Sequence, residues 1–324
     1  MNNLEKTEHF KAVFFLILTT ALWAISFPCM KTLAIMQKNI PLSEWYQSIF
    51  FMVLRFGVSI LGSLIFFPSL KNITRYEISQ GIGMGLFGGI GILFQAHGLF
   101  FTSAFTSAFL TQFSVILVPL VITLYLRKIP PVNMIFASFL ALVSIAILSG
   151  FDIKTLKIGR GEAETLIATF FFTAHILWLQ RKIFSKNSAW HSLFIMNLTA
   201  FVLFLIVCIF SGSLINMWTG LKLYLFSPVA FLMVIITSLI STLLANYLMT
   251  RWQPKVTPPQ ATIIYCFEPL FNSGYVLFLP GLISAIAKIN YPNERITSSM
   301  LIGGILLIIA NLLTELKSII PKRE

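Results

Sequence analysis

Long uninterrupted apolar stretches, following one another along the whole chain, constrain the fold of this sequence more than any other feature. A helix that crosses a bilayer needs about 20 such residues in succession. Transmembrane β-strands are shorter and alternate apolar with polar residues, a pattern that these stretches do not have. Because 57% of the residues are apolar and only 10% are charged, a water-soluble globular domain and a disordered chain are both excluded. We therefore predict an all-α membrane protein.

Ten stretches have the length and composition of transmembrane helices. The connections between most of them are too short to hold a separate fold, and the longest, at residues 279–297, contains Pro280 and Pro292 and is expected to be an exposed loop. The ten predicted spans are residues 12–36, 46–68, 80–101, 103–126, 132–148, 161–184, 188–210, 228–249, 258–278 and 298–316.

The distribution of basic residues between these spans predicts the orientation of the chain. Fourteen Lys and Arg residues fall on the side of the N-terminus and seven on the other side. The positive-inside rule then places both termini in the cytoplasm of a multi-pass protein of the cell (inner) membrane. The net charge of +12 is dispersed between apolar stretches, so we expect the lipid bilayer as its partner and not a nucleic acid.

Weak internal similarity divides the chain near residue 150. At an offset of 150 residues, Pro119, Leu120 and Tyr125 match Pro269, Leu270 and Tyr275. Five spans are an odd number, so a second copy would enter the membrane in the reverse orientation. We therefore predict two inverted five-helix repeats, residues 1–150 with spans 1–5 and residues 151–324 with spans 6–10. Such repeats are typical of transporters that bind their substrate near the middle of the membrane.

Four motifs in order along the chain resemble the drug/metabolite transporter superfamily, in its ten-span EamA-type branch. They are ALWAISFPCMKTLA at 21–34, LRFGVSILG at 54–62, TSAFTSAFLTQFSVILVPLV at 102–121 and VTPPQATIIYCFEPLF at 256–271. The resemblance implies two EamA-like repeats and a transport function. The family often has Gly-Glu directly after the fourth and ninth spans, whereas this chain has LRKIPP and the 279–297 loop.

Charged residues at mid-span depth are the first candidates for a binding site, because a charge there costs about 2.5–3.5 kcal/mol on insertion scales. Arg55 could anchor an anionic group of the substrate, or could hold backbone carbonyls or an acid on another span. Glu268 could carry a coupling proton, bind a cationic group, or pair with Arg55. Lys31 lies in the outer third of the first span, where it could attract substrate or simply extend towards the membrane surface.

Uncharged polar residues extend the candidate site. His175 and Trp178 share one face of the sixth span with Glu164, which suits a cavity wall, although Trp178 could also belong to an interfacial aromatic belt. The others could equally make hydrogen bonds between helices. The predicted substrate-binding residues are Trp23, Ser26, Lys31, Arg55, Gln95, Gln112, His175, Trp178, Tyr247 and Glu268, with Glu268 also the candidate for proton coupling.

The predicted function is secondary transport of a small metabolite by alternating access, an amino acid or a related solute bearing a carboxylate or phosphate. We expect neither an enzyme nor a cofactor or metal, because no nucleophile–base pair, phosphate-binding loop or metal-ligand spacing is present. The alternatives are exchange of a nucleotide-like metabolite such as S-adenosylmethionine, and a non-transporting membrane sensor or assembly protein. A monomer and a dimer are both compatible with the sequence.

Overall fold

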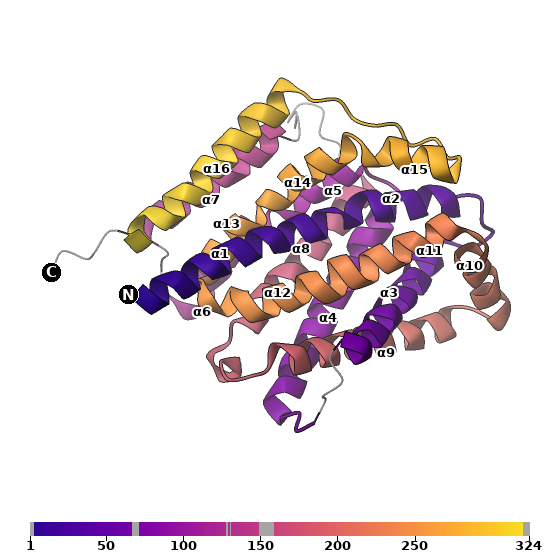
Figure 1. The fold of residues 1–324 in the computed structure, drawn as a ribbon, viewed down its shortest axis with the longest axis horizontal. Coiled ribbons are helices and arrows are strands. Elements are labelled where there is room, and N and C mark those ends of the chain that lie inside the picture. The colour runs from indigo at the N-terminus through magenta and orange to yellow at the C-terminus, as the bar shows by residue number, and fades with distance from the viewer. Residues whose placement is uncertain (1–2, 67–70, 128, 130, 149–158, 320–324) are drawn as a thin grey trace.

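Every secondary-structure element of the computed structural model is a helix within the residues that it describes, 3–66, 71–127, 129, 131–148 and 159–319. Figure 1 shows them as one bundle, with α7 and α16 side by side along one edge. The longer helices are α1 (Asn3–Ala24), α2 (Ser26–Gln37), α3 (Glu44–Phe66), α4 (Arg75–Gly98), α6 (Ser114–Leu126), α7 (Val132–Leu148), α8 (Arg160–Leu179), α9 (Ala189–Ser211), α10 (Leu214–Phe226), α14 (Phe267–Val276) and α16 (Ser298–Ile319). The shorter ones are α5 (Ala104–Thr111), η1 (Lys182–Phe184), α11 (Pro228–Ile235), η2 (Ile236–Leu244), α12 (Ala245–Trp252), η3 (Gln253–Lys255), α13 (Pro258–Tyr265) and α15 (Leu279–Ala287).

The helices confirm an all-α, multi-pass membrane protein, but they do not reach the expected count of ten spans. In the described residues, six helices are long and apolar enough to cross a membrane, or seven if the bent pair Pro258–Val276 and Leu279–Ala287 is one span. Val132–Ile147 and Ser298–Leu313 are apolar but shorter. The predicted sixth span corresponds to α8, which is not among the six and carries Glu162 and Glu164 in its first turns.

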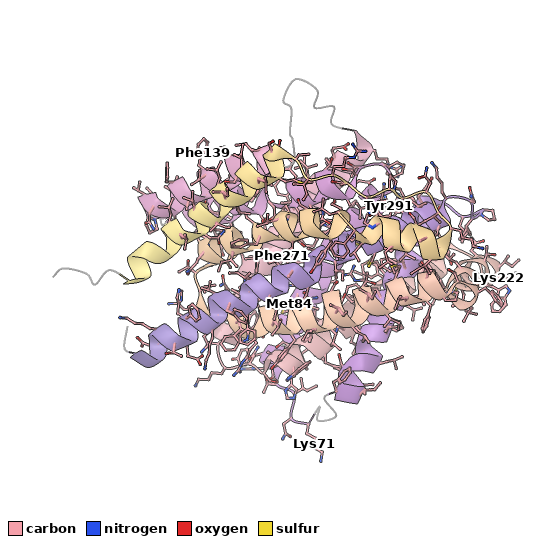
Figure 2. All side chains as sticks on the ribbon, turned by 45° about the horizontal axis from the view of Figure 1, so that its top comes forward. Lys71, Met84, Phe139, Lys222, Phe271 and Tyr291 are labelled. Carbon is pink, nitrogen blue, oxygen red and sulfur yellow. The ribbon has the colours of Figure 1, made fainter. Side chains whose placement is uncertain are left out.

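Apolar side chains also cover the outside of the bundle. Phe139 of α7 is 62% exposed and lies at the edge of the molecule in Figure 2, whereas Met84 of α4 is fully buried. Lys71 and Lys222 lie at the periphery in the same view. An outer surface of this kind matches the hydrocarbon interior of a bilayer.

Three of the long apolar segments are broken near their middle. The break between α1 and α2 is at Ile25, that between α5 and α6 at Gln112 and Phe113, and that between α13 and α14 at Cys266. Proline explains two of them, since a proline nitrogen cannot donate to the carbonyl four residues earlier. Pro28 and Pro269 therefore deprive the Ala24 and Tyr265 carbonyls of their usual helical donors.

A fourth segment changes its hydrogen-bonding pattern without a break. Between α11 and α12, η2 forms nine residues of π-helix, whose hydrogen bonds connect residues five apart. The Thr242 hydroxyl donates to the Thr237 carbonyl over 2.8 Å, across the same five-residue interval. π-helical turns are rare and often occur at functional sites.

Glycine on α4 allows this helix to lie directly against both α8 and α9. A Cβ atom on Gly83 would overlap the Trp178 indole of α8, and one on Gly85 would lie 2.6 Å from the Met196 carbonyl of α9. The Gly-x-Gly-x-x-Gly string at 83–88 is thus part of a helix-packing surface.

One expectation about the connections was wrong, and a second connection contains a helix that was not predicted. Residues 279–297 are not an exposed loop throughout, because Leu279–Ala287 form α15 with Pro280 at its start, where proline is favoured. Residues 214–226 also form a helix, α10. The predicted repeat boundary between residues 150 and 151 lies outside the described residues, so the two repeats stay a prediction.

The remaining 288–297 segment is held to the helices by hydrogen bonds. The Glu294 amide donates to the Val276 carbonyl over 2.9 Å, and the Ser284 hydroxyl donates to the Tyr291 carbonyl over 2.6 Å. Partial burial raises the pKa of the Tyr291 hydroxyl above its ordinary value.

Candidate functional site

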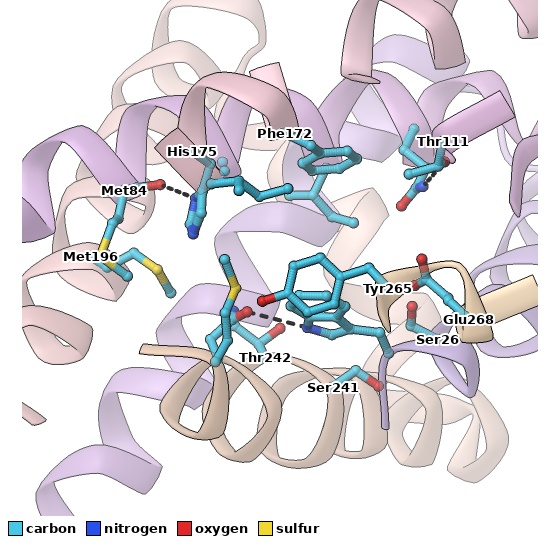
Figure 3. A pocket seen from close by; sticks show the side chains of 18 of the residues that line it. Ser26, Met84, Thr111, Phe172, His175, Met196, Ser241, Thr242, Tyr265 and Glu268 are labelled. Carbon is cyan, nitrogen blue, oxygen red and sulfur yellow. Dashed lines mark hydrogen bonds between the residues drawn. The ribbon is translucent and has the colours of Figure 1, made fainter. Parts of the chain in front are cut away.

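A cavity of about 120 Å³ lies in the interior of the bundle (Figure 3). It is lined by α1, α2, α3, α4, α8, α9, η2, α12 and the broken segments α5–α6 and α13–α14. It combines aromatic and thioether side chains with one cation, one carboxylate and several neutral polar groups. Its lining residues are Trp23, Ser26, Arg55, Phe56, Met84, Gly88, Gly89, Ile92, Gln95, Thr111, Gln112, Ser114, Phe172, His175, Ile176, Met196, Ser241, Thr242, Asn246, Met249, Tyr265 and Glu268.

The cation of the cavity, Arg55, is held by neutral partners. Its side chain is 4% exposed. The Nε atom donates to the Thr242 hydroxyl over 2.6 Å, and Nη1 lies 3.4 Å from the Met30 sulfur. No ion pair joins Arg55 to an acid among the described residues, so the possible pair with Glu268 is not formed. The remaining guanidinium donors are therefore available to an anionic group in the cavity.

The carboxylate of the cavity, Glu268, lies in the first turn of α14, directly after the break at Cys266. The Gln112 amide, at the break between α5 and α6, donates to Glu268 Oε2 over 3.0 Å. Glu268 is 8% exposed and Gln112 is 1% exposed, so both side chains are buried. A carboxylate with one neutral donor keeps unused acceptor sites, so it can also accept from a ligand.

Neutral polar residues of the cavity are oriented by hydrogen bonds to neighbouring helices. Trp23 Nε1 donates to Asn246 Oδ1 over 3.2 Å, and Gln95 Nε2 donates to the Thr111 hydroxyl over 2.9 Å. His175 Nδ1 lies 3.1 Å from the Met84 carbonyl. This contact makes Nδ1 the protonated nitrogen and leaves Nε2 as an acceptor.

Seven of the ten predicted binding residues line the cavity, and three do not. The seven are Trp23, Ser26, Arg55, Gln95, Gln112, His175 and Glu268. The aromatic Tyr265, which the sequence analysis did not select, lies beside Trp23, with ring centroids 5.1 Å apart.

The other three residues make contacts outside the lining. Lys31 Nζ donates to the carbonyls of Leu99 and Thr102, at 2.8 and 2.9 Å. Trp178 Nε1 donates to the Gln80 carbonyl over 3.2 Å, and its indole occupies the space that Gly83 leaves open. Tyr247 stacks on Trp190, with ring centroids 3.8 Å apart, while its neighbour Asn246 faces the cavity.

Several lining residues escaped the sequence analysis, most of them apolar or small. They include Phe56, Thr111, Ser114, Phe172, Ser241, Thr242 and Tyr265. One signal could have found two of them. Thr237, Ser238, Ser241 and Thr242 recur at helical spacing inside a strongly apolar stretch, and hydroxyls at such depth need partners.

Polar clusters connect the helices beyond both ends of the cavity. At one end, Glu164 of α8 contacts His97 of α4 and, over 3.0 Å, Arg160. At the other end, Glu77 of α4 accepts from His191 over 3.1 Å and from the Ser188 amide over 2.8 Å. Glu164 is therefore not part of the cavity wall that its helical face predicted. The described residues contain no group of three or more His, Cys, Asp or Glu side chains suited to a metal ion.

Comparison with solved structures supports the fold. One of them, described only as a crystal structure of a protein, matches with a TM-score of 0.64 and 13% sequence identity, over 98% of this chain and all of the other. No protein-family model matches the sequence, and no curated protein is significantly similar to it. At this level of identity the similarity extends to the fold alone: the chain shares a whole-length helical architecture with a protein of very different sequence.

Proposed function

We propose that the protein is a secondary transporter that binds a small metabolite in the central cavity and exposes it alternately to the two sides of the membrane. The observation that carries this proposal is the cavity itself, which is buried between broken helices and contains both Arg55 and Glu268 with no ion pair between them. Broken helices around a central polar site are typical of secondary transporters. Ionisable residues inside a membrane are expensive, and they usually mark such a site.

The substrate class that fits best is an amino acid or a related small solute bearing a carboxylate. Arg55 keeps guanidinium donors that can bind the carboxylate of such a solute. Since a water occupies about 30 Å³ in the liquid, a cavity of about 120 Å³ corresponds to about four waters. This volume favours an amino acid over a nucleotide-like solute such as S-adenosylmethionine, which has far more non-hydrogen atoms.

The membrane topology is part of the same proposal. All ten apolar stretches cross the cell (inner) membrane, with α7, α8 and α16 completing the set, and both termini lie in the cytoplasm. The two five-helix halves are inverted EamA-like repeats, and the chain is related to the drug/metabolite transporters that it resembles. The broken segments α5–α6 and α13–α14 support this symmetry, because they are the fourth spans of the two proposed halves.

The alternative from another class is a non-transporting sensor or assembly protein. Such a protein needs no buried cavity with a cation and a carboxylate, so the lining of this cavity favours transport. A sensor or assembly role becomes the favoured function only if the transport experiment described next shows no uptake.

Transport by the purified protein in liposomes tests the proposal. Liposomes preloaded with a mixture of amino acids are given labelled amino acids one at a time, with and without an inward cation gradient. We expect saturable uptake of at least one labelled amino acid, and no such uptake by liposomes that lack the protein. If neither amino acids nor labelled S-adenosylmethionine enter, while the protein is folded and inserted, the transport proposal is wrong.

A further inference from the structure

Glu268 shares its end of the cavity with other oxygen-bearing side chains, so this end could bind more than a proton. Three polar side chains from three broken segments line this end of the cavity: Ser26 of α2, Gln112 of α5–α6 and Glu268 of α14. They are 4%, 1% and 8% exposed. Figure 3 shows Ser26 and Glu268 at the same end of the cavity.

Each of these three side chains has an oxygen without a protein partner in the described part of the chain. The hydrogen bond between Gln112 Nε2 and Glu268 Oε2 leaves Gln112 Oε1 and Glu268 Oε1 unbonded. The Ser26 hydroxyl has no hydrogen bond within the same residues. Because the three residues line the cavity, these oxygens are acceptors that a ligand in the cavity can use.

The helix breaks add backbone oxygens to the same place. Helix α14 packs against α1, α2 and α5, so the breaks at Ile25, Gln112 and Cys266 are close together. Pro28 and Pro269 cannot donate to the carbonyls of Ala24 and Tyr265. Nearby carbonyls of α1 are already occupied, since Ser241 donates to Leu22 and Tyr275 donates to Ala21. The negative ends of α1, α5 and α13 and the positive ends of α2, α6 and α14 both lie at these breaks, so the helix dipoles largely cancel there, and the carboxylate of Glu268 supplies the negative charge.

We propose that Ser26, Gln112 and Glu268, with the carbonyls at the helix breaks, form a binding site for one Na⁺ ion. All of its ligands are oxygen, the element that hard cations prefer. The single carboxylate balances one positive charge, whereas Ca²⁺ sites use several carboxylates. Unwound backbone at the break of a transmembrane helix is a known environment for Na⁺. The role of the ion as the coupling cation rests on the proposed transport function, but its binding does not.

Direct binding of Na⁺ tests the site without any transport. The full-length protein in detergent is titrated with ²²Na⁺ in a choline chloride buffer of constant ionic strength. We expect saturable binding of about one ion per chain, displaced by unlabelled NaCl and not by additional choline chloride.

Two variants, each with a matched control, test where the ion binds. We expect Glu268→Gln to weaken ²²Na⁺ binding at least ten-fold and Ser26→Ala to weaken it several-fold. The matched controls are Glu164→Gln, in the polar cluster at the end of α8, and Ser144→Ala, a buried serine of α7 that bonds only to its own helix. Both controls should bind Na⁺ within two-fold of the original protein.

Several outcomes would overturn the site. They are the absence of saturable Na⁺ binding to the original protein, undiminished binding by a folded Glu268→Gln or Ser26→Ala variant, and saturable binding of methylammonium without Na⁺, which would assign Glu268 to a substrate ammonium group. The original protein and Ser26→Ala decide the question if Glu268→Gln fails to fold. Uptake without Na⁺ binding refutes the site alone, whereas Na⁺ binding without uptake of any solute refutes the transport function alone.

Discussion

The two charged sides of the cavity differ in how firmly the charge is held. Arg55 lies between two elements, bonded to Thr242 of the π-helix and in contact with Met30 of α2. Glu268 has one neutral partner, Gln112, and both residues are located at helix breaks. Under the proposed transport function, this difference predicts that the guanidinium is a fixed anchor, whereas the carboxylate exchanges its ligand during each cycle.

Replacing Arg55 should have the largest effect on transport. Arg55→Met keeps the unbranched stem of the side chain but removes the guanidinium, and with it a charge-assisted hydrogen bond to the substrate, which is worth about 1.5–3 kcal/mol. We expect the KM for uptake to rise by roughly 10- to 150-fold, measured in proteoliposomes. Arg55→Lys should recover part of the loss. An unchanged KM in a folded Arg55→Met variant would show that this side of the cavity is only structural.

Glu268→Gln should affect accumulation more than exchange. The amide keeps the shape of the carboxyl group but has no charge with which to hold a coupling cation. We expect accumulation driven by a Na⁺ or proton gradient to fall about ten-fold, with a smaller decrease in exchange of labelled for unlabelled substrate. If a well-inserted Glu268→Gln variant accumulates substrate at the original level, Glu268 has no role in coupling. The proposed difference between Glu268 and Arg55 is then wrong.

Thr242→Val tests whether the π-helix fixes the guanidinium. Valine has nearly the shape of threonine but cannot accept from Arg55 Nε, and a typical hydrogen bond contributes about 1 kcal/mol. We expect a KM increase of roughly five-fold and an unchanged coupling ratio. Thr250→Val is the matched control, since Thr250 bonds only to the Asn246 carbonyl of its own helix. If Thr242→Val and Thr250→Val change the KM equally, the hydrogen bond to Thr242 does not position the Arg55 guanidinium.

Trp178→Phe should have the smallest effect on transport, because the indole lies outside the cavity lining. The change removes the hydrogen bond to the Gln80 carbonyl and some packing against α4. We expect the KM to stay within two-fold of the original and the melting temperature in detergent to fall by a few degrees. A selective loss of transport would return Trp178 to the binding site that the sequence suggested.

The sequence predicted the helices well wherever apolar length alone decides the structure. α3 and α9 follow their apolar stretches almost to the residue, because a long apolar run in a membrane has no alternative to a helix. Composition could not reveal α10 and α15, which lie in connections. Nor could it reveal the π-helix η2, since the choice between intervals of four and five residues depends on the helices packed against it.

The sequence predicts a site residue when its depth in the membrane determines its position. It does not do so when packing against another helix determines where the side chain lies. Arg55, Glu268 and Gln112 are polar at mid-span, so their burial in a shared cavity was foreseeable. Asn246 faces the cavity while Tyr247 stacks on Trp190, and the sequence does not distinguish such neighbours. Trp178 satisfied the periodicity of its helix, but the gap left by Gly83 on another helix determined where its ring lies.

The glycine surface of α4 has a mechanical consequence. With Gly81 against Ile195 and Ser192, Gly85 against Met196 and Gly88 against His175, α4 fits against α8 and α9 with no space to slide. A close fit of this kind moves as one rigid body, because packed interfaces do not deform continuously. Any opening of the bundle must therefore occur between this three-helix block and the broken segments that face it, where the chain already bends.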